Sequence, residues 1–309
     1  MNKKEDYDTV DVISSFPDEE QSRIREIWDK TGKIPPPGTG VSDEHVEQAL
    51  KLVHRKMDLP ATEKTYSIYH LRKWVAAAAI LLLAFTVGYL LTPQTVTAPY
   101  GEMVATELPD GTVAELNSGT EISYHRLFPY WNRTVDLNGE AFFSAESEGR
   151  NPLLIEANSS SIEVTGTEFN VRSWSEEPDR QTEVSVAEGY VRLYPSNQPD
   201  RYVELSEGML SRWNPEMDEP TDPEKAALDE VIGWRENRLV FNNQPLWKIF
   251  REIERRFDIR IQLNDEDITN ETLTAHYSDP DNAEQIIEDI SRVKGLRFSK
   301  TANGFRIYQ

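Results

Sequence analysis

A long apolar run, interrupted only by the polar Thr86, lies at Trp74–Leu91. It reads W-V-A-A-A-A-I-L-L-L-A-F-T-V-G-Y-L-L and contains no charged residue. At about 1.5 Å per residue a helix of this length spans about 27 Å, close to the roughly 30 Å hydrocarbon core of a bilayer. A soluble core helix is rarely apolar on every face, and a signal peptide would lie within about the first 30 residues. The pattern therefore predicts one transmembrane helix over residues 74–92.

Two short amphipathic helices are predicted before this run, within residues 1–73. One follows Pro17, the other follows Ser42, and the run Pro35–Pro37 separates them. Neither apolar stripe is large enough to build a core alone, so a partner protein could complete both faces. The alternative is that the helices pack on each other or stay partly disordered. The six candidate contact residues are Ile24, Ile27, Trp28, Val46, Leu50 and Val53.

Residues 100–213 alternate apolar and polar positions in short runs that Gly and Asn separate. The runs include V-D-L-N-G-E-A-F-F, S-I-E-V-T-G-T-E-F-N-V and T-E-V-S-V-A-E-G-Y-V-R-L. Period-two alternation with this punctuation predicts an all-β antiparallel sandwich or roll. Asn138-Gly139 is a strong turn signal, and Glu188-Gly189 is a weaker one.

The alternation shifts by one residue at Gly166-Thr167. Ile162 and Val164 occupy even positions, whereas Phe169 and Val171 occupy odd positions. A β-bulge at Gly166 would return both apolar pairs to the same core.

The periodicity changes again in residues 236–309. Strand patterns at Arg238–Phe241 and Ile259–Leu263 flank a helical pattern that begins at Pro245, and a second strand, helix and strand follow from Leu273. The order β-α-β-β-α-β predicts a small α+β domain with two helices on one sheet. Residues 214–235, rich in Pro, Asp and Glu, are expected to be a linker. The predicted fold is therefore multidomain, with a helical segment, a transmembrane helix, a β domain and an α+β domain.

Composition and charge exclude several classes of function. The formal charge of -21 argues against direct binding to nucleic acid, and the absence of cysteine excludes disulfides and thiol catalysis. The five histidines lack the i, i+4 spacing of a metal site, so neither a metal nor a cofactor is expected. The sequence contains no G-x-S-x-G, H-E-x-x-H or phosphate loop, so no enzyme is predicted.

Basic residues flank the apolar run on one side only. No Lys or Arg follows the run until Arg126, whereas five precede it closely, at Arg55, Lys56, Lys64, Arg72 and Lys73. The positive-inside rule then predicts a cytoplasmic amino terminus and an exported region over residues 92–309. In a bacterium with two membranes, the helix would cross the inner membrane and the exported region would be periplasmic.

Four sequence blocks strongly resemble the FecR family of transmembrane anti-sigma factors. They are L-P-D-G-T-V-A-E-L-N-S-G-T at 108–120, V-D-L-N-G-E-A-F-F at 135–143, V-T-G-T-E-F-N-V at 164–171 and V-A-E-G-Y-V at 186–191. Each block alone is ordinary turn and strand chemistry, but their order and spacing resemble the family across residues 100–213. Residues 236–309 resemble the carboxy-terminal domain of FecR-like proteins of the Bacteroidetes type, itself similar to the short signalling domain of secretins and TonB-dependent receptors.

This resemblance implies a sensor with two protein partners. Such a protein would hold an extracytoplasmic-function sigma factor at the inner membrane through the six helix residues named above. It would respond to the signalling domain of a TonB-dependent outer-membrane receptor. The break at Pro35–Pro37 departs from the more continuous helix of many family members, so the sigma-binding residues are not carried over from the family.

The resemblance also implies a candidate cleavage bond at Gly166-Thr167. Some relatives are cut at a Gly-Thr in the exported domain, and this pair matches that block. The Thr167 hydroxyl could attack the preceding carbonyl in an N-to-O acyl shift. The alternative is a plain bulge glycine followed by a strand residue.

A function of another class is a membrane-anchored periplasmic scaffold that binds glycan or peptidoglycan. Trp131, Trp174 and Trp213 could stack on sugars if they are exposed, or they could fill the core or a sheet edge. A sigma factor gene beside this one would favour the anti-sigma function over the scaffold.

Overall fold

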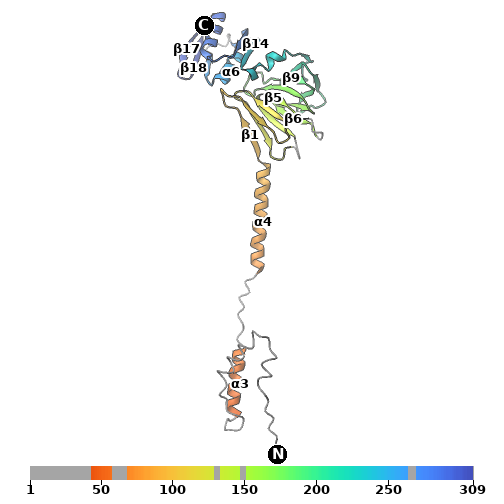
Figure 1. Ribbon diagram of the computed structural model, residues 1–309, viewed down its shortest axis with the longest axis vertical. Helices are drawn as coiled ribbons and strands as arrows, with labels where there is room; N and C mark the ends of the chain where they lie inside the picture. The colour runs from red at the N-terminus through yellow and green to blue at the C-terminus, as the bar shows by residue number, and fades with distance from the viewer. Residues whose placement is uncertain (1–42, 58–67, 129–132, 147–150, 264–268, 309) are drawn as a thin grey trace, which may run out of the picture. The chain divides into compact units, whose positions relative to one another are not determined.

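The computed structural model describes residues 43–57, 68–128, 133–146, 151–263 and 269–308. In the amino-terminal part, helix α3 spans Asp43–Met57. Helix α4 spans Ile68–Leu91 and contains the predicted apolar run, within a segment Leu71–Leu91 that is long and apolar enough to cross a membrane (Figure 1). None of that apolar window is buried against the rest of the protein, as a membrane-facing surface requires.

Within the described residues, thirteen strands form one curled sheet after α4 (Figure 1). Strand β5 belongs to both halves of this sheet. Half A contains β1 (Pro93–Thr97), β4 (Glu121–His125), β6 (Leu153–Ala157), β7 (Ser160–Val164), β10 (Tyr190–Pro195) and β11 (Val203–Ser206). Half B contains β2 (Val104–Glu107), β3 (Val113–Leu116), β8 (Glu168–Ser173), β9 (Thr182–Glu188), β12 (Met209–Trp213) and β13 (Glu224–Lys225). Within this sheet the described strand pairs are antiparallel except β5 with β6, which departs from the antiparallel prediction.

Strand β5 (Thr134–Ser144) passes from half A to half B in the middle of its length. Asn138 pairs with Glu121 of β4, whereas Gly139 pairs with Ser173 of β8. A Cβ atom on Gly139 would lie 2.5 Å from the Thr120 hydroxyl oxygen, so only glycine allows this bend. The turn predicted at Asn138-Gly139 is therefore wrong, because these residues bend a continuous strand and do not end it.

The predicted bulge at Gly166-Thr167 is a corner between two strands. Strand β7 ends at Val164 in half A, and β8 begins at Glu168 in half B, so the bulge prediction is wrong in its geometry. The expected consequence, that the apolar residues before and after this point face the same core, is confirmed. One buried core contains Ile162, Val164, Phe169 and Val171.

Gly189 makes the reverse corner, from β9 in half B to β10 in half A. The weaker turn signal, Glu188-Gly189, correctly marks the end of a strand. The strands that it separates pair with different partners, β9 with β8 and β10 with β7. Gly189 has φ +88°, and a Cβ on it would lie 2.9 Å from the Gly166 carbonyl oxygen. The two corners are therefore packed against each other, and both glycines are needed.

Both ends of the predicted β domain differ from the sequence prediction. Strand β1 pairs with β4, so the sheet begins at Pro93 and not at residue 100. The expected linker at 214–235 contains β13, which pairs with β12, and the short helix α5 (Leu228–Val231). The turn η1 (Gly233–Glu236) follows and buries Trp234. This segment packs against half B and is not a free spacer.

The carboxy-terminal domain, residues 238–308, has the predicted order of elements and ends in a hairpin of two strands. Its elements are β14 (Arg238–Pro245), α6 (Leu246–Phe257), β15 (Arg260–Leu263), β16 (Thr272–Ser278), α8 (Ala283–Lys294), β17 (Arg297–Thr301) and β18 (Gly304–Tyr308). The single sheet that was predicted is instead two, because β14 pairs with β16 while β15, β18 and β17 form a separate three-stranded sheet. One buried core joins the two helices, and it contains Ile249 and Ile253 of α6 with Ile287 and Ile290 of α8.

The packed corners predict a large cost for Gly189→Ala. An alanine at φ +88° is strained and also meets the Gly166 carbonyl, so we expect a loss of at least about 2 kcal/mol in the free energy of unfolding. Gly208→Ala is the matched control, because Gly208 has φ +76° with nothing near its Cβ position, and it should cost only about 1 kcal/mol. Urea denaturation of the purified chain measures both. Equal costs would show that the corners do not press on each other.

Candidate functional site

Helix α3 carries an exposed apolar stripe. Val46, Leu50 and Val53 lie on one face, and 50%, 55% and 56% of their surfaces are exposed. The helix begins with Asp43 and Glu44, whose charges suit its amino-terminal dipole. The other three predicted contact residues, Ile24, Ile27 and Trp28, lie outside the described residues. The described stripe is an amphipathic face of the kind that docks in a partner's groove.

The end of α4 is joined closely to the curled sheet. Thr92 alone separates Leu91 at the helix end from Pro93 at the start of β1. The Thr92 hydroxyl donates to the Tyr89 carbonyl at 2.7 Å, and the Arg126 guanidinium stands 4.2 Å from the centre of the Tyr89 ring. These contacts join the sheet directly to the last turn of the helix.

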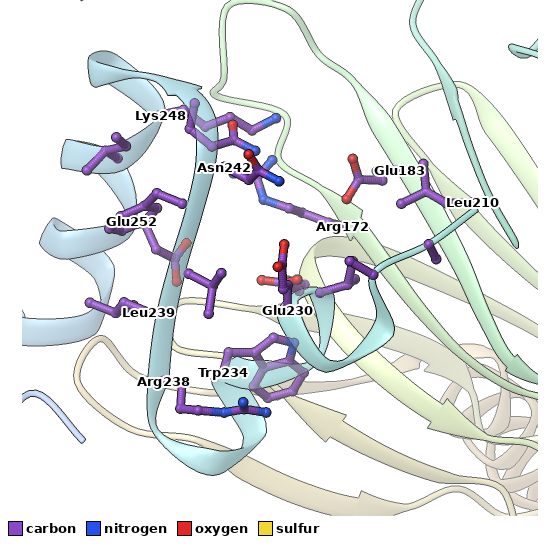
Figure 2. A pocket seen from close by; sticks show the side chains of 18 of the residues that line it. Arg172, Glu183, Leu210, Glu230, Trp234, Arg238, Leu239, Asn242, Lys248 and Glu252 are labelled. Atoms are coloured by element: carbon purple, nitrogen blue, oxygen red, sulfur yellow. The ribbon is translucent and has the colours of Figure 1, made fainter. Parts of the chain in front are cut away.

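The outer face of half B is covered by the carboxy-terminal domain and by residues 224–236. Inward side chains of its strands, such as Phe143 and Val184, fill the β core. Outward side chains line a cavity of about 360 Å³ against α5, β14 and α6 (Figure 2). Its polar lining includes Glu140, Arg172, Glu183, Lys248 and Glu252. We call this contact the docking interface.

Arg255 of α6 is the central side chain of the docking interface. It is only 2% exposed, and its guanidinium lies 3.9 Å from the centre of the Trp174 ring. One terminal nitrogen donates to Glu177 at 3.2 Å and to Glu252 at 3.0 Å. The Arg255 carbonyl also accepts a hydrogen bond from the Gly101 amide at 2.8 Å. Cation–π and ionic contacts from the same residue thus join α6 to the loop after β8.

Residues of η1 add a second set of contacts to the docking interface. The Trp234 indole donates to the side-chain oxygen of Asn170 on β8 at 3.2 Å. Arg235 forms an ion pair with Glu115 of β3, and its guanidinium stacks 3.9 Å from the Phe142 ring centre. Apolar, aromatic and charged contacts therefore all cross this interface.

Glu140 of β5 is a buried acid in the docking interface, with 6% of its surface exposed. Its carboxylate accepts hydrogen bonds from Asn117 at 2.9 Å and from Asn170 at 3.1 Å. Burial, together with the nearby charge of Glu252, raises the pKa of Glu140 to about 7. This acid can therefore change its charge near neutral pH.

Two further ionisable groups there are strongly influenced by their surroundings. Burial lowers the pKa of Lys248, whose closest carboxylate, Asp179, is 4.0 Å away. Burial opposes the charge of Glu177, but a bidentate pair with Arg172 at 2.6 and 2.8 Å lowers the pKa of Glu177 below its ordinary value. Glu177 thus stays charged, whereas Glu140 titrates.

Gly166 and Thr167, the candidate cleavage pair, form the corner between β7 and β8. Gly166 has φ +154°, and Thr167 is 4% exposed. The Thr167 hydroxyl donates to the Tyr190 carbonyl at 2.9 Å, so its oxygen is held in one orientation.

The tryptophans that could have bound sugar are buried where the structure describes them. Trp174 is 1% exposed beneath Arg255, and Trp213 is 5% exposed in the β core. Trp131 lies outside the described residues. In the part of the chain that the structure describes, no group of His, Asp and Glu has the arrangement of a metal site.

The docking interface was missed from sequence. One signal for it is E-A-F-F at 140–143, where Ala141 and Phe143 point into the core while Phe142 points outward. A large aromatic residue on the outward face indicates that another layer covers it. The identity of that layer is not encoded locally, because Arg255 and Glu177 are far apart in sequence.

Family models identify the class to which this molecule belongs. The model described as "FecR protein" matches residues 94–192, and the model described as "FecR, C-terminal" matches residues 238–308. The chain belongs to the FecR family of membrane anti-sigma factors, as its resemblance indicated.

Two crystal structures share the fold of about 70% of this chain. Both are of candidate anti-sigma factors from Parabacteroides distasonis ATCC 8503. One is 25% identical with a TM-score of 0.63, covering 71% of this chain and 99% of that one. The other is 24% identical with a TM-score of 0.63, covering 70% of this chain and 99% of that one. A comparison with curated proteins finds no match.

Removing the Arg255 charge should loosen the docking interface strongly. Arg255→Met keeps the side-chain length but leaves Glu177 and Glu252 short of a buried partner, so we expect a loss of about 3 kcal/mol in the free energy of unfolding. Arg292→Met is the control, because Arg292 is 69% exposed in its pair with Glu288 and should contribute less than about 0.5 kcal/mol. Chemical denaturation compares them. If both substitutions lower the free energy of unfolding by a similar small amount, Arg255 is not the central residue of the docking interface.

Proposed function

We propose that this protein relays a signal from an outer-membrane TonB-dependent transporter, across the inner membrane, to an extracytoplasmic-function sigma factor. Membership of the FecR family, together with a helix able to span a membrane, is the observation that carries the proposal. A family of anti-sigma factors implies a sigma factor partner in general. The type of sigma factor and the receptor are the finer steps that we propose here.

We assign the two sides of the membrane from the charge flanking α4. Basic residues at Arg72 and Lys73 and before them would hold the amino terminus in the cytoplasm, since no Lys or Arg follows until Arg126. Residues 1–73 then contact the sigma factor, and residues 93–309 lie in the periplasm, where the receptor's signalling domain arrives.

The proposed sigma-binding surface is the α3 stripe with the predicted Ile24–Trp28 face. The apolar side chains of this stripe are half exposed, so a partner that covers them removes apolar surface from water and the complex is stabilised. The glycan-binding scaffold has less support, because the Trp174 and Trp213 rings are buried and cannot stack on a sugar.

Leu50→Asp in the full-length chain should weaken capture of the sigma factor by tenfold or more, or about 1.4 kcal/mol, because a charge replaces a central apolar contact. Leu52→Asp is the matched control, since Leu52 is 62% exposed on the same helix but off the stripe. Affinity is measured by pull-down with the sigma factor encoded nearby. Equal binding by both variants, or no capture by the wild type, would contradict the proposal.

We also propose that the Gly166-Thr167 bond is cleaved by the protein itself. The Thr167 oxygen attacks the Gly166 carbonyl carbon, and the carbon–nitrogen bond breaks as the hydroxyl proton passes to the nitrogen. The resulting ester is hydrolysed by water, which restores the hydroxyl and leaves a Gly166 carboxylate. The Thr167 hydroxyl, which its hydrogen bond to the Tyr190 carbonyl holds in one orientation, supports this step.

Thr167→Ala should convert two membrane-associated fragments into one full-length band on an immunoblot, because the attacking oxygen is removed. Thr167→Ser keeps that oxygen and should still be cut. Thr165→Ala, at an exposed neighbouring position, is the control and should leave the two fragments unchanged. A single band in the wild type, or two bands with Thr167→Ala, would rule out this chemistry.

A further inference from the structure

Two carboxylates from different domains meet inside the docking interface. Glu140 comes from β5, and Glu252 comes from α6 with its side chain 13% exposed. The Asn117 amide nitrogen donates to both of them, at 2.9 Å to Glu140 and 3.4 Å to Glu252. Two negative charges that share one amide group at a buried interface repel each other.

The two nearby arginines neutralise this pair only in part, because both also bind Glu177. Arg172 of β8 already gives both terminal nitrogens to Glu177. Arg255 of α6 divides its contacts between Glu177 and Glu252. The other charged groups around the cavity are Glu183 and Arg212 on half B, Glu224, Lys225 and Glu230 after it, and Arg238 and Lys248 from the carboxy-terminal domain.

We propose that the carboxy-terminal domain docks reversibly on half B, and that one proton held at the Glu140–Glu252 pair controls how firmly it docks. With the proton on Glu140, one neutral acid lies beside one carboxylate, which is the stable arrangement for two close carboxyl groups. Without it, the repulsion pushes α6 away from β5. The docked and released arrangements are two states of the exported region, and this equilibrium does not depend on the anti-sigma function.

The direction of the pH effect follows from Glu140. Its pKa is raised from an ordinary 4.5 to about 7 by burial and then by Glu252, and release into water would return it toward the ordinary value. Docking therefore takes up a proton between these values. It is firmest below about pH 4.5, and its equilibrium constant falls by up to about tenfold per pH unit until about pH 7, above which it is level.

The natural absence of cysteine allows a direct test with spin labels in the full-length protein. Tyr190→Cys on β10 and Val293→Cys on α8 replace side chains that are 65% and 69% exposed, one on each side of the docking interface. Pulsed electron resonance on the protein in lipid nanodiscs gives the distance between the labels. We expect one narrow distance at pH 5, and a second, broader population that grows up to about pH 7 and changes little above it.

Glu140→Gln should abolish this response, because a neutral amide keeps the shape and removes the charge. The narrow distance should then persist from pH 5 to pH 8. Glu252→Gln removes the other charge and should weaken the response without abolishing it, because burial alone still raises the pKa of Glu140. This variant keeps the test available if Glu140→Gln does not fold. Glu204→Gln is the control and should respond as the wild type does, since its side chain is 53% exposed on β11.

A distance distribution that stays the same from pH 5 to pH 8 in the wild type would overturn the proposal. An unchanged pH response in both Glu140→Gln and Glu252→Gln would overturn it as well. The readout is an interdomain distance and not capture of a sigma factor, so either result leaves the anti-sigma proposal to its own test.

Discussion

The part of the chain after α4 depends on one strand, β5, that is shared by two halves of a curled sheet. Because β5 bends at Gly139, its outward residues Glu140 and Phe142 face α6 and η1, respectively, while Ala141 and Phe143 face the β core. The bend thus gives the second half of the strand two buried faces. One face is apolar and permanent, and the other is partly ionic and meets a different domain. The division between stable core and adjustable interface begins at this bend.

The two kinds of contact differ in what they contribute. An apolar core loses its stabilisation only by exposing its whole surface to water, which favours a single state. A buried ionic interface gives up part of its Coulomb energy to desolvation, so its net contribution is small while its geometry is specific. Arg255 fits this description, since it joins Trp174, Glu177 and Glu252 and leaves its Nε without a partner among the described residues. Such an interface holds a defined arrangement and can still be released.

Much of this architecture could be predicted from local pattern. The apolar run of α4, the alternation in the β region and the helix faces of α6 and α8 are set by nearby residues, and the structure has all of them. The errors arose where a local signal has more than one structural meaning. Asn138-Gly139 is chemically a turn but is here a bend, and Gly166-Thr167 shifts the alternation through a corner and not a bulge. Strand pairing decides between these meanings, and pairing is not visible in the alternation of one strand.

The docking interface lay further beyond sequence reasoning, because its charges come from segments that only the folded chain brings together. From α4 to the carboxy-terminal domain, the described contacts nevertheless form one connected series. Arg255 links α6 to the β8 loop, β8 pairs with β5, β5 pairs with β4, and β4 pairs with β1, which continues into α4 after Thr92. Strands paired along their length move together more readily than they separate, so a shift at α6 can reach the membrane helix without unfolding the sheet. Arg126 against Tyr89 then fixes the sheet to the helix end, where a small rotation would be carried into the bilayer.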